Sequence, residues 1–126
     1  MKVSINFKKY IIENTKKEKE SEFVVNGIYQ DNVLKFIDND KVINRITINT
    51  NEILVERTSE ITTFMSFKQK LKTKFVMNAP FGHLELDIYT NELIINKEKL
   101  FILYNVLEDF NSYKTYELHI TFTPIK

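Results

Sequence analysis

The fold of this 126-residue chain is indicated most directly by one stretch near its end, Tyr116-Glu117-Leu118-His119-Ile120-Thr121-Phe122. Large apolar side chains occupy every second position of this stretch, and polar side chains lie between them. Because successive side chains of a β-strand point to opposite faces, the alternation predicts a strand with one buried and one solvated face. Its parity places Leu118, Ile120 and Phe122 inward and His119 outward.

The same period of two recurs toward the amino terminus. It predicts strands at residues 3–7, 10–12, 23–29, 33–37, 42–48, 53–55, 61–67, 71–77, 84–88 and 100–106. A change of phase predicts a bulge near Lys8 and Lys9, and the mixed-charge segment 13–22 is expected to be a solvated connection. About eight to ten short strands at this spacing predict a small antiparallel all-β barrel or sandwich, in one domain over residues 1–126.

Two of these segments also fit a helical pattern. Apolar residues spaced by three and four occur over residues 64–75 and 100–110, so a helix is an open alternative at either place. The enrichment of β-branched and aromatic residues favours strands.

Glycine is scarce, and asparagine and aspartate take its place at the expected turns. The predicted turns are Gln30-Asp31-Asn32, Asp38-Asn39-Asp40, Asn49-Thr50-Asn51, Thr90-Asn91 and Asn111-Ser112. Asn and Asp tolerate the left-handed conformation and bond their own backbone, which suits them to such turns. The two glycines, Gly27 and Gly82, are expected at a bulge or a sharp strand bend, and neither belongs to a phosphate-binding loop.

Composition limits the partners that we expect. Eighteen Lys and Arg nearly balance seventeen Asp and Glu, which leaves a formal net charge of +1. Dedicated nucleic-acid binders normally show a strong basic excess. The chain has no Cys, and we find no signal-peptide pattern and no apolar run of membrane-spanning length. We therefore expect a cytoplasmic protein without a membrane partner.

Several short motifs resemble the YwiB-like family of bacterial domains of unknown function. One is Glu22-Phe23-Val24-Val25-Asn26-Gly27-Ile28-Tyr29, and another is Pro80-Phe81-Gly82-His83-Leu84-Glu85-Leu86 followed by Thr90. The resemblance extends from about Val3 to Phe122, and Met77 and Ala79 depart from the hydroxyl-bearing residues that the family has there. It implies a calycin-like (lipocalin-like) β-barrel and no established activity. The structural motif residues that it implies are Glu22, Phe23, Gly27, Pro80, Phe81, Gly82 and Thr90.

Catalytic and metal-binding groupings are few. His83, Glu85 and Asp87 share a strand face, and His and carboxylates are metal ligands. Residues two apart on a strand are about 6.8 Å apart, so the outer two of this trio are too distant to hold one ion without help from another strand. A solvated face is the favoured interpretation. No motif of a nucleophilic triad occurs, and we expect no enzyme activity, no cofactor and no metal.

A row of lysines offers a weaker possibility. Period two would put Lys68, Lys70, Lys72 and Lys74 on one strand face, near aromatic residues that could stack on single-stranded nucleic acid. Lysines on an edge strand also deter aggregation. With a net charge near zero, the edge-protecting interpretation is preferred and nucleic acid is not an expected partner.

Three residues are candidates for an inward binding role. Arg57 could anchor an anionic group at the barrel mouth, although a structural bond to turn carbonyls is the preferred interpretation. Tyr29 and Tyr104 could supply inward hydroxyls on apolar strands. Because an eight-stranded barrel can hold one small ligand, we expect a non-enzymatic module that binds a small apolar or amphipathic ligand. The alternative is a filled barrel acting as a protein-interaction or homodimerising unit.

Overall fold

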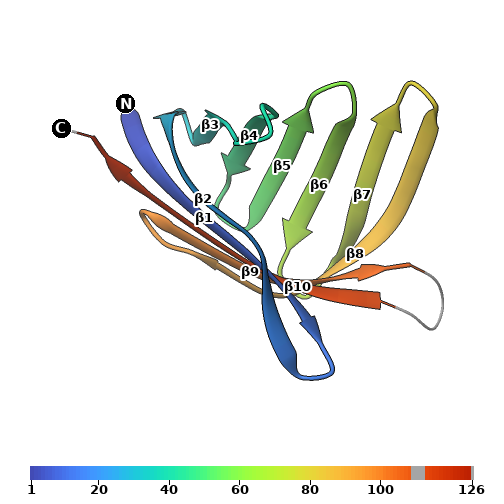
Figure 1. Cartoon of the computed structure of the whole chain (residues 1–126). Coiled ribbons are helices and arrows are strands. Elements are labelled where there is room, and N and C mark those ends of the chain that lie inside the picture. Colours follow the sequence, from blue (N-terminus) through green and yellow to red (C-terminus); the bar gives the residue numbers. More distant parts are fainter. Residues whose placement is uncertain (109–112, 126) are drawn as a thin grey trace.

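Alternating inward and outward side chains run through ten strands, which close into an antiparallel barrel (Figure 1). The computed structural model describes residues 1–108 and 113–125. The strands are β1 (Lys2–Glu13), β2 (Lys16–Gln30), β3 (Val33–Ile37), β4 (Ile43–Ile48), β5 (Glu52–Thr58), β6 (Thr62–Lys68), β7 (Lys72–Ala79), β8 (Gly82–Ile95), β9 (Lys99–Leu107) and β10 (Tyr113–Pro124). Each strand pairs with its neighbour in sequence, and β1 closes the barrel against β10.

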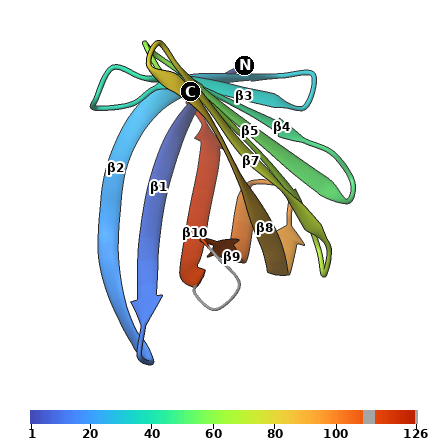
Figure 2. The same cartoon turned by 90° about the vertical axis from the view of Figure 1, so that its right-hand side faces the viewer.

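The strands form two walls that cross. Strands β3 to β8 make one wall, and β9, β10, β1 and β2 make the other, which passes beneath the first in Figure 1. The β1–β2 hairpin extends beyond the rest of the barrel (Figure 2). No helix forms in the described residues, so none there is long and apolar enough to span a membrane.

The pairing of β2 with β3 covers only four residues, so most of β2 has no hydrogen-bonded neighbour on the β3 side among the residues that the structure describes. β2 pairs with β1 from Lys16 to Ile28, but only its last four residues, Gly27 to Gln30, pair with β3. In the described part of the chain, residues 16–26 of β2 therefore have a strand partner on one side alone. We call this segment the free edge of β2. It borders the cavity described below.

The core consists of the inward-facing residues of the strands. Its fully buried members include Val3, Ile5, Leu34, Ile53, Phe67, Ile88, Leu100 and Ile102. The predicted parity of β10 is confirmed: Leu118, Ile120 and Phe122 are at most 5% exposed. His119 lies on the outer face between the rings of Tyr10 and Phe101, with centroid distances of 5.7 and 4.9 Å.

Several sequence predictions are confirmed at the level of turns and bulges. Asp31 and Asn32 form the two-residue β2–β3 turn with φ values of 52° and 65°, as hairpin turns of this type require. The β1–β2 register shifts between Lys9 and Tyr10, where the bulge was expected. The predicted turn Asn111-Ser112 lies outside the described residues.

Two predicted connections are wrong. Residues 16–22 belong to strand β2 and are not a loop, although all but Ser21 are exposed. Their charges do not alternate with apolar residues because this segment projects beyond the core in the β1–β2 hairpin, so the sequence carries no period of two. Thr90-Asn91 is not a turn but a bulge within β8, where the pairing with β9 shifts between Thr90 and Glu92.

The four lysines also do not share one strand face, contrary to the prediction. Lys68 ends β6 and pairs with Glu52 at 3.4 Å, whereas Lys72 and Lys74 lie at the start of β7. The chain reverses between them at Lys70, whose φ of 62° is left-handed and whose N–H donates to the Thr90 carbonyl at 2.8 Å. A turn thus divides the row. The helical alternatives for these segments and for 100–107 are likewise replaced by strands.

The two glycines have different roles. Gly27 is packed tightly in mid-strand between Val3 and Phe36, and not at a bulge: a Cβ added there would lie 2.5 Å from the Lys35 carbonyl oxygen. Gly82 begins β8 directly after the Pro80-Phe81 turn, with a φ of 159° and no atom within 4 Å of an added Cβ. Steric crowding therefore requires glycine at position 27 but not at position 82.

We predict that Gly27→Ala destabilises the fold by about 1–3 kcal/mol, because overpacking forces strands apart. Gly82→Ala should lower the stability less, because an added side chain has room there and only the φ of 159° disfavours alanine. Denaturant unfolding of both variants beside the parent measures the two losses. Equal stability of the parent and Gly27→Ala would show that β2 and β3 can separate without cost.

Candidate functional site

A cavity of about 550 Å³ lies between the two walls, beside the free edge of β2. This volume is in the range of small-molecule sites. Its inner part is lined by apolar and aromatic side chains that include Ile46, Val55, Met65, Tyr104, Leu118 and Ile120. Its rim carries the charged residues Lys9, Glu20, Glu22, Asp38, Asp40 and Arg57. We call this space the β2 cavity.

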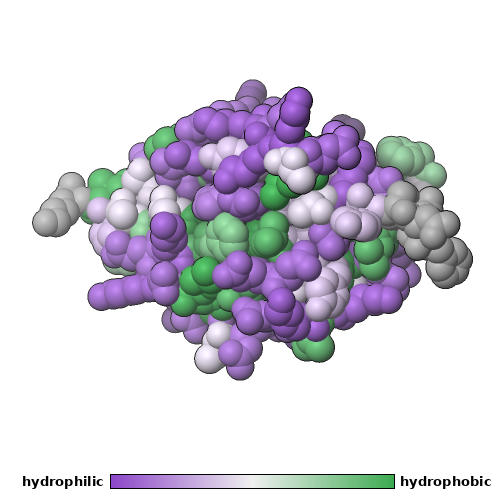
Figure 3. All heavy atoms as spheres, turned by 90° about the horizontal axis from the view of Figure 1, so that it is seen from below, coloured by the Kyte–Doolittle hydropathy of each residue, from purple (hydrophilic) through white to green (hydrophobic). Residues whose placement is uncertain are grey.

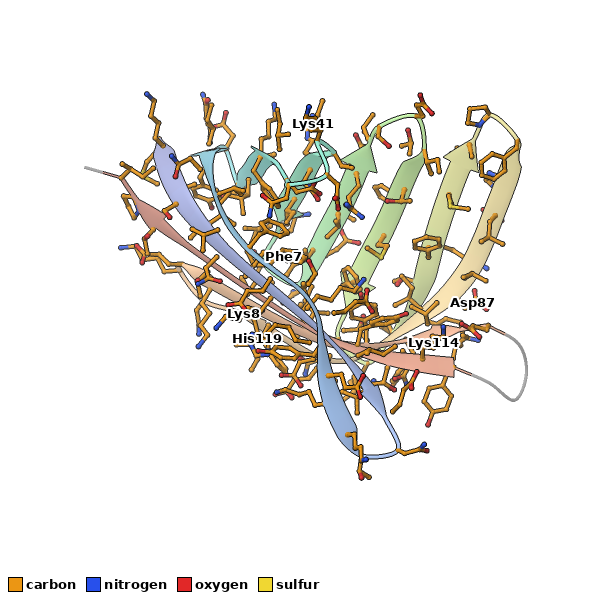
Figure 4. All side chains as sticks on the ribbon, in the orientation of Figure 1. Phe7, Lys8, Lys41, Asp87, Lys114 and His119 are labelled. Atoms are coloured by element: carbon orange, nitrogen blue, oxygen red, sulfur yellow. The ribbon has the colours of Figure 1, made fainter. Side chains whose placement is uncertain are left out.

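Phe7 and Phe23 form the side of the β2 cavity that belongs to β1 and β2. Their rings are stacked at a centroid distance of 4.6 Å, and Phe23 also contacts Phe36 at 6.1 Å. Figure 4 places Phe7 between the walls, whereas Lys8 and His119 lie beneath them on the outer face. The alternation along β1 therefore presents an aromatic surface to the interior.

Tyr104 lies deep in the β2 cavity, with the inward orientation that the alternation of β9 predicts. It is 2% exposed. The centroid of its ring lies 4.8 Å from that of Phe67 and 5.4 Å from that of Tyr116. Burial, aided by Tyr116 and Glu20, raises the pKa of the Tyr104 phenol far above its usual value. Its hydroxyl is protonated at neutral pH, as in an ordinary tyrosine, and can donate a hydrogen bond to a ligand.

Arg57 lies at the rim of the same cavity and is bonded to the β3–β4 turn. Its Nη2 donates to Asp38 Oδ2 at 2.9 Å. Asp38 also accepts from the backbone N–H groups of Asp40 and Val42, at 2.9 and 3.1 Å, and from Asn44 Nδ2 at 3.0 Å. Arg57 thus contacts a carboxylate that is itself built into the turn, and its side chain forms no other hydrogen bond among the described residues.

The surroundings of Asp38 favour its charged form. Its side chain is almost wholly buried, and burial alone would raise its pKa. The hydrogen bonds from Asn44, the Val42 N–H, Arg57 and the Asp40 N–H outweigh that effect and hold the pKa of the Asp38 carboxyl below its usual range. A buried carboxylate with four donors orders the turn that forms one side of the cavity mouth.

Lys9 is a cavity residue that the sequence interpretation missed. It has the same parity as Phe7 and points inward, with Nζ 3.4 Å from Glu20 Oε1 and 4.7 Å from the centroid of the Tyr116 ring. Strict alternation from Val3 through Phe7 could have identified it as an inward charge. Lys9 therefore shows that a carboxylate and an aromatic ring at this rim hold an ammonium group.

Tyr29 is not in the β2 cavity. It lines a separate hollow of about 750 Å³ that is bordered by Met1, Asn32, Asn49 and Phe122. The β2–β3, β4–β5 and β8–β9 turns gather there, so this hollow lies at the barrel end opposite the β3–β4 turn. Of the three residues considered for an inward binding role, the structure brings Arg57 and Tyr104 together and separates Tyr29 from them.

The motif residues fall into three places. Glu22 and Phe23 line the β2 cavity, and Glu22 is bonded to Lys19. Pro80 and Phe81 form the exposed β7–β8 turn, with Phe81 80% exposed. Thr90 is fully buried at the β8 bulge, and its Oγ1 has no hydrogen-bond partner among the described residues.

The three residues of the predicted metal trio on β8, His83, Glu85 and Asp87, do not converge on one point. His83 Nδ1 lies 2.5 Å from Asn78 Oδ1, and Lys74 donates to Asp87 at 2.7 Å. Glu85 is 3.7 Å from His83 on the exposed outer face. Within residues 1–108 and 113–125, no three such side chains are arranged to share an ion.

We predict that Asp38→Asn lowers the free energy of unfolding at neutral pH by about 1–3 kcal/mol, because Arg57 and the turn amides lose their charged acceptor. The folded-state pKa is depressed, so this contribution is present above the unfolded pKa, near the ordinary value of 3.8, and is lost as pH falls through the folded value. Denaturant unfolding between neutral and acidic pH measures the difference. Asp40→Asn, an exposed change in the same turn, is the control, and a deficit of Asp38→Asn that persists unchanged in strong acid contradicts the account.

Comparisons with known proteins support the barrel architecture. The crystal structure of the YwiB protein from Bacillus subtilis superposes with a TM-score of 0.74 over 99% of this chain and 92% of that chain, with 20% sequence identity. At this identity the likeness shows the fold alone. A search of curated proteins finds no match. The family model described as Domain of unknown function (DUF1934) matches residues 5–120. The chain therefore belongs to this family, as its resemblance to YwiB-like domains predicts.

Proposed function

We propose that this protein is a non-enzymatic binding module and that the β2 cavity takes one small amphipathic ligand. The observation that carries the proposal is the arrangement of the cavity: an apolar interior around Met65 and Tyr104 lies directly beneath a rim of charged groups. A ligand with an apolar body and one polar end matches both parts.

The geometry supports this proposal in a second way. The free edge of β2 borders the cavity, so a ligand can enter without breaking strand pairing. Tyr104 offers a protonated hydroxyl within an otherwise apolar surface, which can orient a polar atom of the ligand.

Filling the cavity should weaken binding. We expect the neutral fluorescent dye phenylnaphthylamine to bind the parent protein saturably, and Met65→Trp to weaken binding by at least about tenfold, because the indole occupies the space next to Tyr104. Met65 is half-buried and so tolerates a larger side chain better than a core residue does.

Val24→Trp is the matched control for this titration. Val24 follows Phe23 on β2 but is 64% exposed on the opposite face, so this variant should bind the dye like the parent. Absence of saturable binding to the parent, or equal weakening in both variants, would contradict the proposal.

A second candidate function, a homodimerising unit, is favoured by one observation on the outer surface. Ile94, Phe101 and Leu103 face outward on β8 and β9, and Ile94 is 41% exposed. Figure 3 shows apolar side chains gathered in the middle of the face seen from below, where β9 and β10 lie in Figure 1. An apolar centre with a polar border can face its own copy across a two-fold axis.

Sedimentation velocity tests this second candidate. If the outer face dimerises, the parent should sediment as a dimer and Leu103→Glu as a monomer, since the new carboxylate lies opposite Glu92 and Glu117 on the neighbouring strands. Val24→Glu, on the outer face of β2, should leave the dimer intact. A parent protein that is monomeric at all concentrations excludes this function.

A further inference from the structure

We infer that the ligand of the β2 cavity carries a cationic polar end, an ammonium group on an apolar body, and not a carboxylate or phosphate. This inference rests on the proposed function and specifies its ligand class. It follows from the charges at the rim, from the partners that those charges already have, and from the way the cavity holds its own ammonium group.

The rim of the cavity has more carboxylates than cations. Four carboxylates line it, from Glu20, Glu22, Asp38 and Asp40, against the two cations of Lys9 and Arg57. Glu22 is bonded to Lys19 just outside, but Asp40 forms no ion pair among the described residues. With Lys19 counted, the excess is one negative charge, at Asp40, which favours a cation over an anion.

Both cations are already paired. Arg57 donates to Asp38 at 2.9 Å, and Lys9 lies 3.4 Å from Glu20. An anionic ligand that took Arg57 would leave Asp38 buried without its cationic partner, which is costly. This geometry therefore does not favour the alternative in which Arg57 anchors an anionic group.

Lys9 shows how an ammonium group is held beside the cavity. Lys9 Nζ lies over the Tyr116 ring at 4.7 Å and beside Glu20. Tyr116 in turn stacks on Tyr104, which lines the interior. A ligand whose ammonium group lies near Glu20 and Asp40 can extend its apolar body past Tyr104 toward Met65, with charge contacts at the rim and apolar contacts inside.

The test compares three probes with the same ten-carbon tail: decylamine, decanol and decanoate, each below its micelle concentration at neutral pH. Their affinities are measured by displacement of phenylnaphthylamine from the 126-residue chain. We expect decylamine to bind at least about threefold more tightly than decanol, and decanoate more weakly than decanol. Added salt should reduce these differences, since the rim is open to solvent.

Variants assign the preference to the rim. In the double variant Glu20→Gln, Asp40→Asn, the ratio of decylamine to decanol affinity should fall toward one while decanol affinity is retained. Glu56→Gln is the matched control, because Glu56 is an exposed carboxylate on the outward side of β5, next to Arg57 in sequence. It should leave the ratio unchanged.

The outcomes separate the two proposals. If none of the three probes displaces the dye, and none binds the protein when the dye is left out, the proposed function itself fails. If decanoate binds as tightly as decylamine, or if the double variant keeps the full preference for the amine, the cavity binds ligands but the inference about their charge is overturned.

Discussion

The four-residue pairing between β2 and β3 is the constraint on which the rest of this structure depends. It closes the barrel, because among the described residues β2 otherwise pairs only with β1. It also ends at Gly27, where the Lys35 carbonyl approaches so closely that a side chain cannot fit. Beyond Gly27 the two strands separate, and the space between the free edge of β2 and the β3–β4 turn becomes the mouth of the cavity. The short β2–β3 pairing therefore both closes the barrel and leaves the entrance to the cavity.

The charged groups at that mouth act on the fold as well as on a ligand. Asp38 collects two backbone amides, Asn44 and Arg57, and this network orders the turn opposite the free edge. Across the mouth, Lys9 and Glu20 form a looser pair over the Tyr116 ring. One side is therefore held by a buried hydrogen-bond network and the other by an ion pair that is open to solvent.

Much of the barrel could be predicted from local alternation, because inward and outward residues differ in polarity wherever a strand covers the core. This holds for β10 and for Tyr104 on β9.

The strand at residues 16–22 could not be predicted, since it projects beyond the core and its charges carry no period of two. The Thr90 bulge resembled a turn because Asn91 follows it. Arg57 and Tyr104 were identifiable as inward, but the link between Arg57 and Asp38 spans nineteen residues and arises only when β3 and β5 flank β4. The length of the β2–β3 pairing, which locates the cavity, has no sequence signal that we can name.

The central claim is that the space beside the free edge of β2 is the ligand site. Backbone and methyl chemical shifts recorded by NMR during a titration with phenylnaphthylamine test it most directly. The account predicts saturable shifts that centre on Met65, Phe23 and Tyr104, with little change at Tyr29 or at the outward Phe101. Shifts that centre instead on Tyr29 and Met1, or on Phe101 and Leu103, would place the site elsewhere and contradict it.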